Sequence, residues 1–270
     1  MVIGSTELVA IVGSPIAQVK SPENFNNWFA AHGENLAMLP IDLHERSLEV
    51  FLDTLRGWQN LRGCVVTVPY KQRIAGCLDA LSERAGALRS VNVIRRERDG
   101  RLVGDNVDGE GFLNAARQQG FAVAGKRALV VGAGGVGSAI AYSLGQAGIA
   151  SLSLVDACNE RSGALADLLG GAFPELPIES GAGASLAAFD LLVNASPVGM
   201  GDSGELPLPQ ALLDSLAPTA HVADVVTSPA ITPLLAFARQ RGCSIQTGPQ
   251  MAIAQAGHLG HFMGVTPLQL

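Results

Sequence analysis

The sequence predicts an α/β protein of two domains. Apolar residues make up 48% of the 270 residues and charged residues 16%, which is enough to bury a large core. Short apolar runs rich in Val and Ile alternate with longer amphipathic segments, a pattern typical of sheets with connecting helices. A Gly-rich stretch at 132–137 opens a second series of this kind. We expect one domain over 1–107, completed by a C-terminal helix at 249–270, and a second domain over 108–248.

The elements expected in the first domain follow from periodicity and from turn residues. Ser21 is expected to cap the helix that follows the first strand, with Pro22 in its first turn. Asp99 and Gly100 are expected to form the turn of a β-hairpin over 91–106. The remaining expected strands are 8–13, 36–43 and 63–71, and the expected helices are 21–33, 47–58 and 73–90.

In the second domain, residues 126–157 have the pattern strand, Gly-rich turn, helix, strand. A helix over 109–121, which ends near Gly120, comes before this unit. The further expected elements are helices at 159–170, 232–241 and 249–264, and strands at 189–196, 221–226 and 243–248.

Composition excludes several classes of function. The formal charge of −6 and the absence of a basic stripe argue against nucleic acid or an anionic membrane surface as a partner. No apolar run approaches the ~20 residues of a membrane span, and the N-terminus lacks the pattern of a signal peptide. The four cysteines form no CxxC and the histidines no HExxH; His258 and His261 are interpreted as ordinary helix residues. We therefore expect a soluble cytoplasmic protein without a metal.

The Gly-rich turn LVVGAGGVG predicts a dinucleotide site. Gly132 allows a tight turn, Gly134 lets a pyrophosphate approach the backbone, and Gly137 allows close packing of strand and helix. The next expected strand ends in Asp156, whose carboxylate suits a ribose 2′-hydroxyl and repels a 2′-phosphate. This favours NAD; NADP stays open because the Arg161 side chain could swing toward a phosphate.

Two residues are candidates for acid–base chemistry. Lys71 is expected at the C-terminal end of a strand, and Asp108 follows the hairpin at the inferred domain boundary. A lysine and a carboxylate converging on one hydroxyl group can move its proton during hydride transfer. The residues alone leave the alternative open that Lys71 is a surface lysine and Asp108 a helix cap.

Seven stretches in order give the chain a family resemblance. It resembles the shikimate/quinate dehydrogenases in GSPIAQVKSPENFN, VVTVPYK, SVNVI, GDNVDG, GAGGVG, NASPVGM and GPQMAIAQA. The resemblance implies an N-terminal α/β substrate domain, a Rossmann-like NAD(P)-binding domain and a cleft between them. It also implies reversible oxidation of a ring hydroxyl of shikimate, quinate or an aminoshikimate-type relative to the 3-dehydro ketone, within the shikimate pathway of aromatic amino acid biosynthesis.

The resemblance assigns roles to individual positions. It makes Lys71 and Asp108 the catalytic pair. The positions that it assigns to substrate binding are Ser21, Thr67, Asn92 and Gln255. The positions that it assigns to the cofactor are Gly132, Ala133, Gly134, Gly135, Val136 and Gly137 in the phosphate turn, and Ala195, Ser196, Val226 and Gly248 on the nicotinamide side.

The chain also departs from the family pattern. Val19 replaces one of two serines that grip the substrate carboxylate, and Thr227 replaces a tyrosine. Val65 replaces an asparagine of the family pattern and Val107 replaces a threonine. Asp156-Ala157-Cys158 lies where the family has a motif that binds NADP. These changes leave a second hypothesis, a catalytically reduced ligand-binding or sensor protein of the same fold. The expected partner is a small polyhydroxy cyclohexene or cyclohexane carboxylate, and the sequence does not decide between a monomer and a homodimer.

Overall fold

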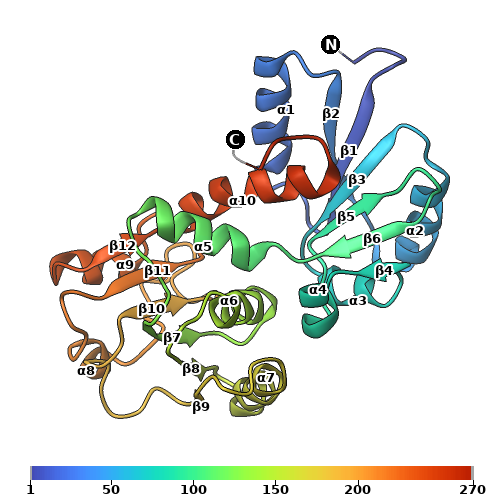
Figure 1. Ribbon diagram of the computed structural model, residues 1–270. Helices are drawn as coiled ribbons and strands as arrows, with labels where there is room; N and C mark the ends of the chain where they lie inside the picture. The colour runs from blue at the N-terminus through green and yellow to red at the C-terminus, as the bar shows by residue number, and fades with distance from the viewer. Residues whose placement is uncertain (1, 269–270) are drawn as a thin grey trace. The chain divides into compact units, whose positions relative to one another are not determined.

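The structure is a computed structural model that describes residues 2–268. It divides into two compact units, one made of the chain up to Val107 together with the segment from Ala256, and the other of Asp108–Gln255 (Figure 1). The division thus falls inside the C-terminal helix, whereas the sequence assigns that whole helix to the first domain. Each unit holds a sheet and helices, which confirms the predicted α/β class.

The first unit contains a mixed sheet in the order β2-β1-β3-β5-β6-β4. Strands β2, β1 and β3 are parallel, whereas β5 runs antiparallel to β3 and to β6. The elements are β1 (Glu7–Gly13), α1 (Ser21–His32), β2 (Leu36–Asp42), the short 3₁₀ helix η1 (Glu45–Ser47), α2 (Leu48–Gly57), β3 (Leu61–Val66), α3 (Lys71–Ala75), β4 (Ala80–Leu81), α4 (Glu83–Leu88), β5 (Val93–Arg96) and β6 (Leu102–Asp105).

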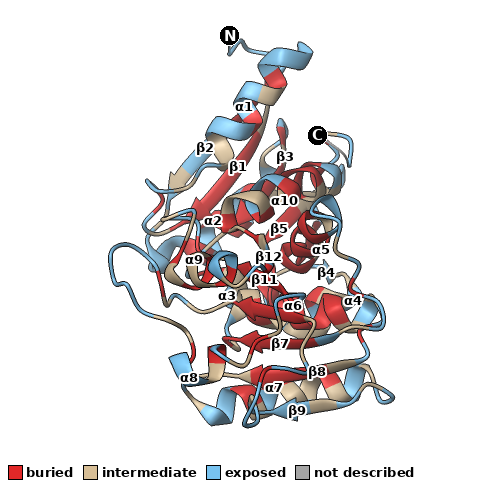
Figure 2. Ribbon diagram, turned by 90° about the vertical axis from the view of Figure 1, so that its left-hand side faces the viewer, coloured by how far each residue is buried: buried red, intermediate tan, exposed pale blue. Residues whose placement is uncertain are grey.

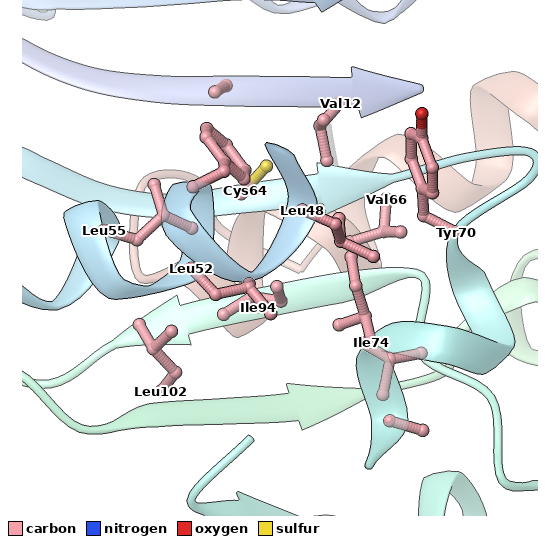
Figure 3. Packing of buried hydrophobic residues seen from close by; sticks show 14 of the residues in the cluster. Val12, Leu48, Leu52, Leu55, Cys64, Val66, Tyr70, Ile74, Ile94 and Leu102 are labelled. Carbon is pink, nitrogen blue, oxygen red and sulfur yellow. The ribbon is translucent and has the colours of Figure 1, made fainter. Parts of the chain in front are cut away.

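Helices cover both faces of this sheet. On one face, Leu48, Leu52 and Leu55 of α2 point toward the strands and pack around Cys64 and Ile94 (Figure 3). On the other face, α1 and the second half of α10 (Gly248–Met263) bury a separate cluster that includes Phe25 and Met263. Strand β1 has no exposed side and is coloured as buried along most of its length (Figure 2). Such two-sided burial is typical of a parallel strand between helix layers.

Local expectations for this unit are partly corrected. The hairpin is confirmed, because Arg96 pairs with Leu102 across the turn and Gly100 has φ +90°. The helix expected over 73–90 is wrong: α3 ends at Ala75, and the backbone of Asp79 donates to Leu102 O at 3.0 Å. The short strand β4 thus pairs with β6, and this tertiary contact overrides the local helical pattern.

The cap predicted for α1 is also wrong. Ser21 is the first helical residue and not the cap, since the N-cap position is Lys20 and no side chain caps this helix. Pro22 does lie in the first turn, as predicted.

The second unit contains a fully parallel sheet in the order β12-β11-β10-β7-β8-β9. Counted from β7, this is the order 3-2-1-4-5-6 of a doubly wound nucleotide-binding domain. The strand order reverses at β7: the strands up to β9 extend the sheet on one side of β7, and those from β10 onward extend it on the other side. The elements are α5 (Asp108–Gln118), β7 (Arg127–Val131), α6 (Gly135–Gln146), β8 (Ser151–Val155), α7 (Asn159–Ala172), β9 (Ile178–Ser180), β10 (Leu191–Asn194), α8 (Gln210–Leu213), β11 (His221–Asp224), α9 (Pro233–Gln240), β12 (Ser244–Gln246) and the first half of α10.

Candidate active site

The Gly-rich turn lies at the switch point of the parallel sheet, where β7 meets β10. Gly132 has φ +105°, and a Cβ there would stand 2.7 Å from the backbone of Ala195. A Cβ at Gly137 would overlap the carbonyl of Gly132. These two positions therefore admit only glycine, and together they set the turn that leads from β7 into α6.

The next positions of the turn form an open cradle. A Cβ at Gly134 or Gly135 would meet nothing within 4 Å, and no side chain caps the start of α6. Backbone N–H groups at an uncapped helix start attract anions. The residues present thus fit the pyrophosphate of a dinucleotide.

Asp156 is tied to this turn. Its Oδ2 accepts a hydrogen bond from the backbone N–H of Ala133 at 2.8 Å, and its Oδ1 accepts one from Cys158 N at 2.9 Å. Burial opposes its ionisation, but the two N–H donors and the charge of Arg161 outweigh burial and hold the pKa of Asp156 below its usual range. The carboxylate is therefore ionised at neutral pH and fixed beside the first turn of the dinucleotide motif.

On the other side of the switch point, a buried polar network builds the loops after β10 and β11. Asn194 donates from Nδ2 to both carboxylate oxygens of Asp224 at 3.1 Å, and its Oδ1 accepts from the N–H of Ser196 at 3.1 Å. Asp224 also accepts from Thr232 Oγ1 at 2.7 Å and from Val226 N at 2.9 Å. Burial raises the pKa of Asp224, and these donors act in the opposite direction.

This network holds the backbone of Ser196 and Val226, two positions that the resemblance assigns to the nicotinamide side. Gly248 lies against the same loop, since a Cβ there would overlap the Val226 carbonyl. Sequence reasoning missed Asn194, Asp224 and Thr232. The sequence does contain a pattern that could have indicated two of them: Asn194 and Asp224 are polar residues at the ends of otherwise apolar strands.

Asp108 is the first residue of α5 and is 4% exposed. Its Oδ1 accepts a hydrogen bond from Nε2 of Gln255 at 2.6 Å. The following residue, Gly109, packs directly on α6, where a Cβ would overlap Ser143 and the carbonyl of Ala139. The start of α5 is thereby fixed against the helix that carries the phosphate turn.

Several positions of the first unit to which the resemblance assigns substrate binding or catalysis lie around the ends of β3 and β5. Lys71 is the first residue of α3 and not the end of a strand, because β3 ends at Val66 and a turn closes with Tyr70 N donating to Thr67 O at 3.1 Å. The backbone of Val91 donates to Lys71 O at 2.8 Å, which ties α3 to the segment before β5. Asn92 is buried, and its Oδ1 accepts from Val107 N at 2.9 Å.

A second missed cluster supports Asn92. Arg84 makes a bidentate ion pair with the buried carboxylate of Asp105, at 2.8 and 2.6 Å, and Ser82 donates to the same carboxylate. Asp105 also accepts from the N–H of Asn106 at 2.7 Å, and its own carbonyl accepts from Asn92 N at 3.0 Å. Sequence reasoning gave no signal for the Arg84–Asp105 pair, because it joins residues on α4 and β6 that only the fold brings together.

Val19 is partly buried and packs against the cluster that holds Phe25 and Met263. Its polar neighbours bond locally: Gln18 donates to Pro15 O at 2.9 Å, and Lys20 lies 3.5 Å from Glu23. Ser21 lies beside them, at the start of α1.

Within 2–268, no three His, Cys, Asp or Glu side chains gather as a metal site. No helix in that range is both long and apolar enough to cross a bilayer.

Fold and site together define a class. The second unit has a doubly wound parallel sheet with a glycine cradle at its switch point and an acidic residue after its second strand. It also has a buried aspartate at the start of the helix that packs on α6. This is the arrangement of a nicotinamide-dependent oxidoreductase.

Comparison with known proteins identifies the family. Residues 11–94 match the model of the shikimate dehydrogenase substrate binding domain. Shikimate dehydrogenase (NADP(+)) of Moorella thermoacetica is 39% identical over 257 residues, which cover 93% of this chain and 85% of that protein. The chain belongs to the shikimate dehydrogenase family, and it is a shikimate dehydrogenase-like oxidoreductase.

Solved structures agree with this assignment. The shikimate 5-dehydrogenase of Listeria monocytogenes, in complex with shikimate and NAD, superposes with a TM-score of 0.91 at 27% identity, covering 98% of this chain and 94% of that one. The quinate dehydrogenase of Corynebacterium glutamicum, in complex with NAD, gives a TM-score of 0.86 at 30% identity, covering 96% and 93%.

Proposed function

We propose that the protein catalyses the reversible oxidation of a ring hydroxyl of shikimate, or of quinate or an amino analogue, to the 3-dehydro ketone, with NAD preferred over NADP. The observation that carries this proposal is the buried Asp108, held at the start of α5, in a chain that belongs to the shikimate dehydrogenase family. A cytoplasmic location and a place in aromatic amino acid biosynthesis follow as part of the same proposal.

The preference for NAD rests on Asp156. Its carboxylate is fixed by Ala133 and Cys158 where the adenosine ribose of a dinucleotide lies in this class of domain. A negative charge there accepts hydrogen bonds from a ribose 2′-hydroxyl and repels a 2′-phosphate. The Moorella relative is named for NADP(+), whereas the Listeria and Corynebacterium structures contain NAD.

The chain supplies acid–base chemistry and binding. When bound, the nicotinamide ring accepts or returns a hydride. We assign to Lys71 and Asp108 the transfer of the hydroxyl proton, because an ammonium and a carboxylate at one oxygen can give and take it. Ser21, Thr67 and Asn92 are assigned to the substrate, and the backbone at 195–196, Val226 and Gly248 to the nicotinamide side.

One activity panel tests the function. Purified protein is assayed with shikimate and quinate against NAD and NADP, and with 3-dehydroshikimate against the reduced cofactors. We expect turnover of at least one acid, faster with NAD. Ligand-induced thermal stabilisation without turnover at millimolar substrate would instead identify the ligand-binding alternative and overturn the proposal.

Lys71→Ala tests the catalytic assignment. Loss of a positioned acid–base group lowers rates by about 10²–10⁴-fold, so we expect kcat to fall by that amount while substrate binding stays measurable by calorimetry. Lys126→Ala, a half-exposed lysine paired with Asp190 at 3.8 Å, is the matched control and should keep wild-type rates. A Lys71→Ala protein with wild-type kcat contradicts the assignment.

A further inference from the structure

The side chain of Gln255 bonds a residue proposed to be catalytic. Its Nε2 lies 2.6 Å from Oδ1 of Asp108, although the two residues are 147 positions apart in the sequence. Hydrogen bonds to an ionised acceptor are shorter and about twice as strong as neutral ones. Asp108 is 4% exposed, so water competes little for this oxygen.

Close packing of α5 against α10, together with two side-chain hydrogen bonds, holds Gln255 in this position. A Cβ at Gly111 would stand 2.6 Å from the Cβ of Gln255, so α5 and α10 meet with no side chain between them. Asn114 Nδ2 donates to Ala254 O at 3.3 Å, which ties the next turn of α5 to the residue before Gln255. Gln246 Nε2 donates to Phe112 O at 3.3 Å and anchors the same helix from the end of β12.

We infer that Gln255 is a positioning residue for Asp108: its amide fixes the rotation of the carboxylate at the start of α5. This inference rests on the proposed function and deepens it, since the family resemblance assigns Gln255 only to substrate binding. The two roles differ in what they change. A substrate ligand affects mainly affinity, whereas a residue that orients the acid–base group affects kcat.

Gln255→Met provides the first test, because methionine keeps the length and bulk beside Gly111 but cannot donate. We expect kcat for shikimate to fall by about 10- to 100-fold, the size of a lost hydrogen bond to a charged group. The dissociation constant of shikimate, measured by calorimetry, should change by less than about 3-fold. The matched control Gln210→Met makes the same change at an exposed glutamine that donates to Asp214 at 3.0 Å, and it should leave kcat within about 2-fold.

Asp108→Ala, which removes the acceptor oxygen, completes a double-mutant cycle. If Gln255 acts through Asp108, adding Gln255→Met to Asp108→Ala lowers kcat no further. If the kcat losses of the two single variants instead multiply in the double variant, the inference is overturned. It is also overturned if the Gln255→Met protein has wild-type kcat and weakened shikimate binding. Gln255→Ala repeats the cycle if the methionine variant does not fold.

The same four proteins give a readout without turnover. The free energies of unfolding by urea should be non-additive, because the hydrogen bond exists only when both side chains are present. Additive values overturn the inference even if the wild type has no activity on any substrate of the panel. Failure of the wild type in that panel overturns the proposed function alone, so the two failures are distinguishable.

Discussion

Asp156 shows how one residue can serve both structure and specificity. Its two oxygens accept from Ala133 and Cys158, which stabilises the turn of the dinucleotide motif, and its charge is what distinguishes NAD from NADP in our proposal. The sequence alone placed an acid after the second strand. The bond to Ala133, which brings the charge to the turn, requires β7 and β8 to pair in register.

Asp156→Asn should weaken the cofactor preference. The substitution keeps the size of the side chain but removes the charge that repels a 2′-phosphate, so we expect the ratio of kcat/KM for NAD over NADP to fall by about tenfold or more, or about 1.4 kcal/mol. Steady-state rates with both cofactors measure it. Glu160→Gln removes an exposed charge from the next helix and should leave the ratio unchanged. An unchanged ratio in the Asp156 variant would assign the preference elsewhere.

At the scale of elements, α5 is the helix on which the site depends. It contacts α6 through Gly109 and α10 through Gly111, and it begins with Asp108. The sequence predicts this helix well, because its apolar positions recur with helical spacing. It gives no sign of which helices pack on it, since a glycine inside a helix indicates a close approach but not the partner.

Gly109→Ala should destabilise the second unit. The added methyl overlaps Ser143 and the Ala139 carbonyl, and overpacking of this kind costs about 1–3 kcal/mol. Gly163→Ala is the matched control: a Cβ there meets nothing within 4 Å inside α7, so helix propensity should stabilise the protein by about 0.5–1 kcal/mol. Urea denaturation measures both. Equal stabilities for the two variants would contradict the close packing of α5 on α6.

At the scale of the molecule, the stability of the second unit should depend on pH through His221. This side chain is fully buried at the start of β11, stacks on Phe121 at 4.6 Å and bonds Ser244 Oγ at 2.8 Å. Burial lowers its pKa below the ordinary value, and the Gln246 side chain acts in the opposite direction. A group that binds its proton more weakly in the folded state favours unfolding once the unfolded chain is protonated.

The lowered pKa of His221 sets the direction in which the stability changes with pH. The unfolding free energy should be fully retained above pH ~6.5, the ordinary value for histidine, and should decrease as the pH falls below it. The slope contributed by one such group is at most about 1.4 kcal/mol per pH unit. His221→Gln should remove this contribution between pH 7 and 5, whereas His261→Gln, at an exposed position, should keep the wild-type dependence. Denaturant unfolding at several pH values measures it, and identical profiles for wild type and His221→Gln would refute the assignment.

Features that depend on near neighbours could be predicted from the residues alone: the α/β class, the hairpin at Asp99-Gly100, and the glycine turn from β7 to α6. Each follows from spacing, φ preference or alternation within about ten residues. Features that depend on distant partners could not be predicted in this way and are seen only in the folded chain. β4 interrupts the predicted helix because it pairs with β6, Asn194 bonds Asp224 across two parallel strands, and Gln255 reaches Asp108 from the last helix. Such contacts form when the chain buries its apolar faces, and no local pattern encodes which polar groups then meet.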